Sequence, residues 1–220
     1  MKTWFYNTLK ENKGLLLFII LMSVFRSAVA DWNEVPTGSM QPTIVEGDRI
    51  LVNKMAYDIR IPFTHVSIIK RADPVRGDIV VFDSEQSGKR LVKRVIGIPG
   101  DMVEMKNNVL IINGEEIAYR DIDHSGKGGD KIENLMGIKH IVRIKETNSN
   151  YLSTFKAVRV PEGHYLVLGD NRDNSADSRV IGFVPRQEIV GRSRDVVMSL
   201  DYENFYLPRS ERFFHALDAD

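Results

Sequence analysis

The sequence of 220 residues contains no cysteine, and this absence removes several kinds of site at once. A disulfide framework, a cysteine nucleophile and a zinc–thiolate site are all excluded. Histidine is also scarce, since the chain has five and none lies in a metal-binding spacing such as H-E-x-x-H. A zinc site is therefore not predicted. A Ser-His-Asp triad can assemble from distant residues, but His65, His124 and His140 fall in loop-like or inserted segments, which disfavours it.

An excess of either charge is absent as well. The chain carries 30 basic and 30 acidic residues, so its net charge is zero and no nucleic-acid-binding footprint is visible. Hydrophobic residues make up 43% and charged residues 27%, which is typical of a folded globular chain rather than a disordered one. The length allows one large domain, or a medium domain with a smaller one.

Only one long apolar run is present, Gly14–Phe25, which reads GLLLFIILMSVF. Lys2, Lys10 and Lys13 precede it. Between the run and Ile50, four acidic residues outnumber two basic ones. Because lysine and arginine are retained on the cytoplasmic side of a membrane, this bias predicts a cytoplasmic N-terminus with the rest of the chain outside.

Two interpretations of this run stay open. A cleavable signal peptide is suggested by AVA at Ala28–Ala30, which has the A-x-A form of a cleavage site. A retained anchor over Gly14–Ala30 would form about 25 Å of helix, against a hydrocarbon core of about 30 Å. In that case Arg26 would reach the outer headgroups and Trp32 would lie in the interfacial region. Arg26, so close to the cut site, argues against the signal peptide.

Beyond Trp32 the chain alternates between short segments rich in β-branched residues and turns of Gly, Pro, Asn and Asp. No long 3.6-residue apolar period follows the anchor. The predicted fold class is therefore mainly β, an antiparallel-sheet domain with a smaller inserted β subdomain, preceded by one N-terminal transmembrane helix. The expected strands lie within 48–57, 77–82, 90–98, 108–114, 157–170 and 188–200.

The division into domains follows from composition. The polar stretch 121–150 contains HSGKGGD and KETNSN, both loop-like, in the middle of the β region. We expect a cytoplasmic N-terminus at 1–13, a transmembrane anchor at 14–30, a main β domain at 31–101 and 163–220, and an inserted subdomain at 102–162. Five aromatic residues near the carboxyl end either pack on the core or face a membrane or a partner: Tyr202, Phe205, Tyr206, Phe213 and Phe214.

The stretch PTGSMQPT, residues 36–43, presents Ser39 between glycine and methionine with no histidine nearby. Taken alone, it can be a turn. As a nucleophile, Ser39 would need a base, and the S-x-x-K pattern is absent because Pro42 occupies the lysine position. A pair with a distant lysine is the remaining option. Such a lysine must be neutral, and burial in apolar surroundings lowers its pKa.

Lys93 meets that requirement. It lies in RLVKRVIGIPGD, inside an expected strand. Its neighbours two positions away, Leu91 and Val95, share its face of the sheet and are apolar. Lys54 and Lys89 have weaker apolar flanks. A lysine on a solvated strand face is the alternative interpretation of this stretch.

The polar loop DNRDNSAD has the acids and amides of a calcium-binding loop, but it fails the EF-hand pattern. With Asp170 counted first, Arg172 is third and Ser175 is sixth, where a ligand and a glycine are needed. A loop held by Asx-type hydrogen bonds is the other interpretation.

Together these stretches resemble the type I signal peptidases, also called leader peptidases. PTGSMQPT is similar to the family's serine box, S-G-S-M-x-P-T, with Thr37 in place of the first serine. RGDIVVF (76–82), KRVIGIPGD (93–101) and GDNRDNSADSR (169–179) are similar to its later boxes, in the family's order. One apolar segment precedes the serine, as in the short form of the family.

The resemblance implies a role for each matching residue. Ser39 would be the nucleophile and Lys93 the general base. The Ser39 backbone N–H and the Thr37 hydroxyl would form the oxyanion hole, and Ser175 would orient the Lys93 amine. Arg94 with Asp170, and Asp177 with Arg179, would form two supporting pairs. A small pocket for alanine-like side chains would be lined by Val35, Met40, Ile44 and Val92.

The resemblance further implies a membrane-bound serine endopeptidase that removes N-terminal signal peptides after A-x-A-type sites from exported preproteins, with no metal or organic cofactor. It implies a single-pass protein of the cytoplasmic (inner) membrane, with the N-terminus in the cytoplasm and the catalytic domain on the outer, periplasmic face. Exported preproteins and membrane lipid would be its partners, no nucleic acid would bind, and the chain would act as a monomer.

Three alternatives stay open. A relative of narrow specificity, such as a conjugation-linked peptidase that matures one pilin, would share all four boxes. A self-cleaving repressor would share the Ser–Lys pair, but the apolar segment and the lack of a DNA-binding region argue against it. A membrane-tethered binding protein could keep the fold without activity, although Ser39, Lys93 and Ser175 together argue for an enzyme.

Overall fold

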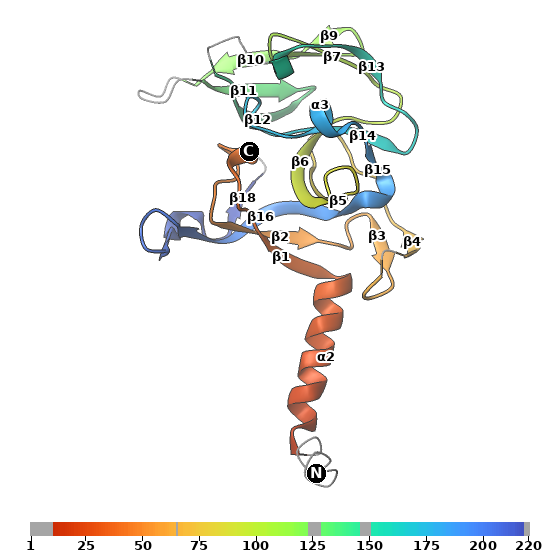
Figure 1. Cartoon of the computed structure of the whole chain (residues 1–220), viewed down its shortest axis with the longest axis vertical. Helices are drawn as coiled ribbons and strands as arrows, with labels where there is room; N and C mark the ends of the chain where they lie inside the picture. Colours follow the sequence, from red (N-terminus) through yellow and green to blue (C-terminus); the bar gives the residue numbers. More distant parts are fainter. Residues whose placement is uncertain (1–10, 65, 123–128, 146–150, 218–220) are drawn as a thin grey trace.

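The computed structural model describes residues 11–64, 66–122, 129–145 and 151–217, and strands make up most of their regular secondary structure. One long helix, α2 (Lys13–Ala28), projects from one end of a β body, and a short helix, α3 (Ser178–Ile181), lies within that body (Figure 1). The mainly β, antiparallel class predicted from the sequence is confirmed. Within the described residues, no helix combines the length and the apolar character needed to cross a membrane.

Helix α2 covers most of the segment predicted as a helix from the sequence, and it ends at Ala28 because the chain enters a strand at Ala30. Its leucine, isoleucine, phenylalanine and methionine side chains are compatible with helix, and no proline interrupts them. None of its side chains is buried. Figure 1 shows that it meets the β body only at its C-terminal end.

The main sheet has the strand order β1-β2-β16-β5-β6-β14-β15, and two short strands also pair with β16. Because β14 pairs with β6, the strand that carries Lys93 lies directly beside the strand that leads into the polar loop 169–179. The bounds are β1 (Ala30–Glu34), β2 (Asp48–Asn53), β5 (Ile79–Ser84), β6 (Lys89–Gly97), β14 (His164–Leu168), β15 (Val184–Pro185), β16 (Ile189–Asp201), β17 (Leu207–Pro208) and β18 (His215–Ala216).

Between β6 and β14 the chain forms two smaller sheets, at the end of the body opposite α2 (Figure 1). One has the order β13-β7-β8-β9 and the other β10-β11-β12. A separate two-stranded sheet, β3 with β4, precedes β5. The bounds are β3 (Asp58–Arg60), β4 (Ser67–Lys70), β7 (Met102–Lys106), β8 (Val109–Ile112), β9 (Glu115–Glu116), β10 (Ala118–Asp121), β11 (Asp130–Leu135), β12 (Ile138–Arg143) and β13 (Phe155–Arg159).

The hairpin β11–β12 lies within the polar stretch 121–150 and was not among the strands expected from the sequence. The two loop-like stretches predicted there, HSGKGGD and KETNSN, lie largely outside the described residues. The strands between them were missed because their buried face carries polar residues. Glu133 and Leu135 are buried on β11, and His140 and Val142 are buried on β12. Two polar residues on the inner face hide the alternation that identifies a half-buried strand.

The core beneath the serine stretch is apolar and well formed. Val35, Met40 and Ile44 pack in one cluster with residues of β2, β5 and β16. Val95 belongs to a second cluster, formed mainly by β5, β14 and β16, against which Leu91 packs. The serine stretch and the lysine strand are therefore held by buried side chains on both sides.

A buried ion pair joins the two parts of the body. Arg172, in the loop after β14, donates to the Glu133 carboxylate of β11 at 2.7 Å, and both side chains are fully buried. Tyr119 Oη donates to the same carboxylate at 2.6 Å. The charge of Arg172 and hydrogen bonds from its neighbours hold the pKa of Glu133 well below its ordinary value, although burial alone would raise it.

We expect Arg172→Met to destabilise the fold by about 3–5 kcal/mol, because it leaves the Glu133 carboxylate buried without its arginine. The measurement is chemical denaturation of the full chain in detergent. The double variant Arg172→Met with Glu133→Gln is the control and should recover part of the loss, since neither charge remains. A single variant as stable as the wild type would contradict this role of the ion pair.

Candidate active site

Ser39 lies in a single 3₁₀ turn, Gly38–Met40, which follows β1. Gly38 and Met40 are buried, whereas Ser39 is partly exposed. The turn is closed by the Gln41 N–H, which donates to the Gly38 carbonyl at 3.1 Å. Buried neighbours on both sides fix the backbone, so the Ser39 side chain is presented at the surface of the body on a rigid base.

Lys93 is the hydrogen-bond partner of Ser39. Its side chain projects from the middle of β6 and is only 2% exposed. The Lys93 Nζ donates to Ser39 Oγ at 2.8 Å and to the Val92 carbonyl at 2.8 Å. Burial lowers the pKa of Lys93 to about 8, while the nearby charges of Asp177 and Asp170 act in the opposite direction. A large fraction of this amine is therefore neutral in mildly alkaline solution.

The loop after β14 clamps the serine turn through Asn171, a residue that the sequence analysis did not single out. The Asn171 backbone N–H donates to the Ser39 carbonyl at 3.1 Å, and its Nδ2 donates to the Gly38 carbonyl at 2.9 Å. Asn171 is buried. Asn171 lies in the polar loop next to Asp170, which the sequence did single out. Only the fold reveals that Asn171 contacts the serine turn.

Asp170 ties the same loop to the lysine strand. Arg94, next to Lys93, donates to both oxygens of the Asp170 carboxylate, at 2.9 and 2.8 Å, and both side chains are almost fully buried. Thr43 Oγ1 donates to Asp170 Oδ2 at 2.6 Å. Burial alone would raise the pKa of Asp170, but the Arg94 charge and hydrogen bonds hold it below its ordinary value.

Asp177 and Arg179 form a second buried pair in this loop. Arg179 Nε and Nη2 donate to the two oxygens of Asp177, each at 2.8 Å. The Gly169 N–H donates to Asp177 Oδ2 at 3.0 Å, and Arg179 Nη2 also donates to the Arg172 carbonyl. These bonds close the loop on itself, so that Asp170 and Asn171 are held in register with the serine turn.

Ser175 lies in the site but does not hydrogen-bond to Lys93. Its hydroxyl is buried and lies near the Asp177 carboxylate, whose pKa it helps to lower, and no hydrogen bond joins it to Lys93 within the described residues. Gly169 packs against it closely, because a Cβ added at Gly169 would lie 2.3 Å from Ser175 Oγ and 2.4 Å from the Ser39 carbonyl oxygen. Only glycine at position 169 leaves room for the Ser175 hydroxyl beside the serine turn.

A groove of about 450 Å³ opens onto Ser39 and Lys93. One wall is formed by residues 32–37, which include Val35 and Thr37, and the other by residues 89–93 of β6, which include Val92. Met40 lines it as well. Ile44 does not line the groove; it is fully buried in the core, where it packs in one cluster with Val35 and Met40.

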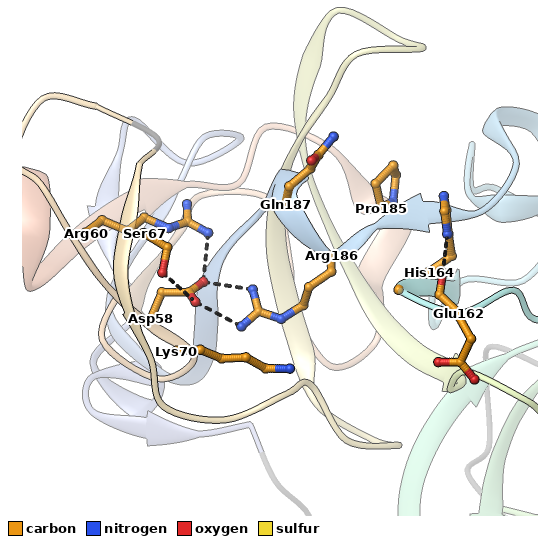
Figure 2. Close-up of a pocket in the computed structure, with 10 residues that line it drawn as sticks. Asp58, Arg60, Ser67, Lys70, Glu162, His164, Pro185, Arg186 and Gln187 are labelled. Atoms are coloured by element: carbon orange, nitrogen blue, oxygen red, sulfur yellow. Dashed lines mark hydrogen bonds and ion pairs between the residues drawn. The ribbon is translucent and has the colours of Figure 1, made fainter.

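A second and larger cavity, of about 540 Å³, lies elsewhere and is drawn in Figure 2. Its charged side chains largely neutralise one another. Arg186 donates to the Asp58 carboxylate at 2.8 and 3.1 Å, and Arg60 donates to the same carboxylate at 3.1 Å (Figure 2). Neither Ser39 nor Lys93 lines it. The smaller groove, which holds the serine and the lysine, is therefore the candidate active site.

The histidines do not compete with Lys93 for this role in the described part of the chain. His65 and His124 lie outside the described residues. His140 is buried and its Nε2 lies 3.1 Å from the Glu133 carboxylate. Among the described residues, no three His, Asp or Glu side chains are grouped so that they could hold a metal ion.

The sequence is similar to a known family over most of its length. The sequence model of the family described as signal peptidase, peptidase S26, matches residues 9–198. Two proteins named signal peptidase I, from Pseudomonas aeruginosa and Pseudomonas fluorescens, are 39% and 38% identical over 200 and 205 residues. Each comparison covers 84% of this chain and 69% of the relative.

Two further similarities span other genera. A signal peptidase I of Buchnera aphidicola subsp. Schizaphis graminum is 33% identical over 261 residues, covering 91% of this chain and 82% of the relative. Among solved structures, a signal peptidase I of Enterococcus faecalis is 31% identical, with a TM-score of 0.37 over 55% of this chain and 97% of that one.

We expect Lys93→Met to stabilise the fold by about 2 kcal/mol at pH 7, because it removes an ammonium group from a buried site. The pKa of Lys93 is about 8 in the folded chain and near its ordinary 10.5 when unfolded. Between these values the unfolded state binds more protons, so wild-type stability rises with pH. The advantage of the variant should therefore shrink from pH 8 to 10.5.

The measurement is thermal or chemical denaturation of both proteins across this pH range. Lys89→Met is the matched control, because Lys89 lies on the same strand and is exposed; its stability should not change. A destabilised Lys93→Met variant at pH 7 would show that the buried amine contributes more through its hydrogen bonds than its charge costs.

Proposed function

Since the chain belongs to the signal peptidase family, peptidase S26, it is a peptidase that removes signal peptides, and we propose that Ser39 is its nucleophile and Lys93 its general base. The observation that carries this assignment is the 2.8 Å hydrogen bond between Ser39 Oγ and the Nζ of Lys93, a lysine whose side chain is buried. No other titratable group is required to accept the serine proton.

The chemistry follows from the protonation state of the lysine. A neutral Lys93 amine accepts the proton of Ser39 Oγ while that oxygen attacks the carbonyl carbon of the cleaved bond. The resulting ammonium then donates a proton to the leaving amine, and an acyl-enzyme remains on Ser39. In the second half, the neutral amine activates a water molecule that hydrolyses the ester.

We propose that two groups donate hydrogen bonds to the oxyanion of the tetrahedral intermediate, the Ser39 backbone N–H and the Thr37 hydroxyl. Two features support this assignment. The Asn171 bonds to the Gly38 and Ser39 carbonyls hold the turn, and so fix the direction of the Ser39 N–H. Thr37 lines the groove beside Ser39 and is exposed to it. Donors that are already oriented need no reorganisation when the negative charge develops.

Ser175 is proposed as a positioning residue for Lys93, through its effect on the Lys93 amine rather than on the substrate. Its hydroxyl is buried beside the Ser39 carbonyl and close to Asp177, a carboxylate whose charge acts on Lys93. The amine of Lys93 is the group that such a hydroxyl would orient once the lysine loses its proton.

The substrates are exported preproteins, and we propose that the segment around the cut adds to the groove as a strand. In the described residues, β14 pairs with β6 only from Arg94 to Gly97, so Lys89–Lys93 have no partner on that side. Val35, Met40 and Val92 are then placed to accept small side chains such as alanine, and to exclude larger ones.

We also propose that the apolar N-terminal segment is a retained single membrane span, with the catalytic domain on the outer face of the cytoplasmic membrane. Helix α2 leads directly into β1, one wall of the groove. An apolar helix with no buried side chain has a surface suited to lipid. The site would then lie close to the membrane surface, where signal peptides emerge. The chain would act there as a monomer.

We expect Ser39→Ala and Lys93→Met each to lose nearly all cleavage of a preprotein in vitro, by a factor of at least about 10³, because the pair acts as one unit. The assay follows the mature product by gel electrophoresis or mass spectrometry. Lys156→Met is the control, because Lys156 is exposed on β13 and does not line the groove, and it should retain wild-type activity. Substantial cleavage by either variant would refute the Ser–Lys assignment, and a panel of preproteins in the same assay separates broad from narrow specificity.

The activity of the wild type should rise with pH through a midpoint near the pKa of Lys93, about 8. The base must be neutral, so the neutral fraction increases as pH rises through the pKa, from about one tenth at pH 7 to about nine tenths at pH 9. The measurement is the pH dependence of kcat/KM on a peptide substrate. A profile that is flat from pH 6 to 10 would rule out a lysine base.

A further inference from the structure

The groove that holds the catalytic pair extends beyond it to Trp32. This residue lies on β1 and lines the same groove as Ser39 and Lys93. Its side chain is 43% exposed, although an indole of this size is usually buried to a greater extent. Val35, on the same wall, lies close to Ser39 and is buried. Because a strand advances about 3.3 Å per residue, Trp32 lies about 10 Å along the groove from Val35.

The indole of Trp32 contacts Arg26, which lies near the end of α2 and is itself hydrogen-bonded to residues of the β body. The Arg26 guanidinium lies over the ring, with Cζ 4.3 Å from the ring centroid. Arg26 Nε and Nη2 donate to Asp31 Oδ1 at 2.9 and 2.7 Å. Lys54 Nζ donates to the Arg26 carbonyl at 2.7 Å. The bonds to Asp31 thus fix the position of the Arg26 guanidinium, which covers one face of the Trp32 ring in a cation–π contact.

A rigid aromatic ring with an exposed part in a substrate groove is suited to an apolar side chain. Signal peptides carry an apolar segment just before the small residues at the cut. If small residues occupy the pocket near Val35, a strand-like substrate reaches Trp32 with a residue about three positions further upstream. That residue falls about four to six positions before the cleaved bond, where the apolar segment ends.

We propose that Trp32, positioned by Arg26, forms a subsite that binds an apolar side chain of the signal peptide about four to six residues before the cut. This inference rests on the proposed function of the groove. It adds a specificity-determining residue to the known reaction, outside the pocket for small side chains. The subsite selects substrates whose apolar segment stands at a fixed distance from the cleaved bond.

The test uses the full chain in detergent micelles and pairs of preprotein peptides that differ only by leucine or serine at position −4, −5 or −6 from the cut. The wild type should prefer leucine at one of these positions by about tenfold in kcat/KM. In Trp32→Ala the leucine-to-serine ratio at that position should fall to about one, with the serine peptide cleaved as before. Trp32→Phe should keep most of the preference, and Arg26→Ala should reduce it in part.

Leu51→Ala is the matched control. Leu51 pairs with Trp32 across β1 and β2, is 37% exposed, and does not line the groove. Its leucine-to-serine ratio should equal that of the wild type. If Trp32→Ala lowered kcat/KM equally for both peptides, Trp32 would be assigned to lipid contact or to stability, and the subsite would be overturned. An unchanged leucine-to-serine ratio of kcat/KM would overturn it as well. A wild type that cleaves neither peptide would refute the proposed function itself, and the subsite with it.

Discussion

The rest of the site is arranged around one constraint, which is that the buried Lys93 amine is held within hydrogen-bond distance of Ser39 Oγ. In the proposed role of Lys93 as a base the amine must lose its proton, and burial in the body favours that loss. Two carboxylates nearby, Asp170 and Asp177, act in the opposite direction, because a negative charge stabilises the ammonium form. The two acids anchor the polar loop, and the site must nevertheless limit how far their charges raise the pKa of Lys93.

The buried arginines resolve this conflict. Arg94 pairs with Asp170 and Arg179 pairs with Asp177, each through two hydrogen bonds. A paired carboxylate has most of its field cancelled at the lysine, so the acids can anchor the polar loop without restoring the ordinary pKa of Lys93. The two ion pairs therefore affect both the position of the loop and the protonation state of Lys93, the proposed base.

The inserted part of the chain contributes to the same arrangement. Arg143, at the end of β12, donates its backbone N–H to the Asp170 carbonyl at 2.8 Å and accepts from the Arg172 N–H at 2.9 Å. Its side chain donates to Gln41 Oε1 at 3.0 Å, next to the serine turn. Together with the Arg172–Glu133 pair, these bonds support the polar loop from the side opposite the lysine strand. The insert thus acts as a support for the loop that positions the serine turn.

The sequence by itself determined the mainly β class, the apolar N-terminal segment, and the ordered stretches that contain Ser39, Lys93 and the polar loop, because these depend on local composition and on residue order. It could not locate the strands β11 and β12, whose buried face carries Glu133 and His140, since their partner Arg172 is distant in the chain. Only the tertiary structure decided that Asn171 clamps the serine turn, that Ile44 lies under the groove rather than in it, and that Ser175 stands beside the turn without reaching Lys93. These facts follow from the pairing of β6 with β14, a contact between strands about 70 residues apart along the chain, which no local pattern specifies.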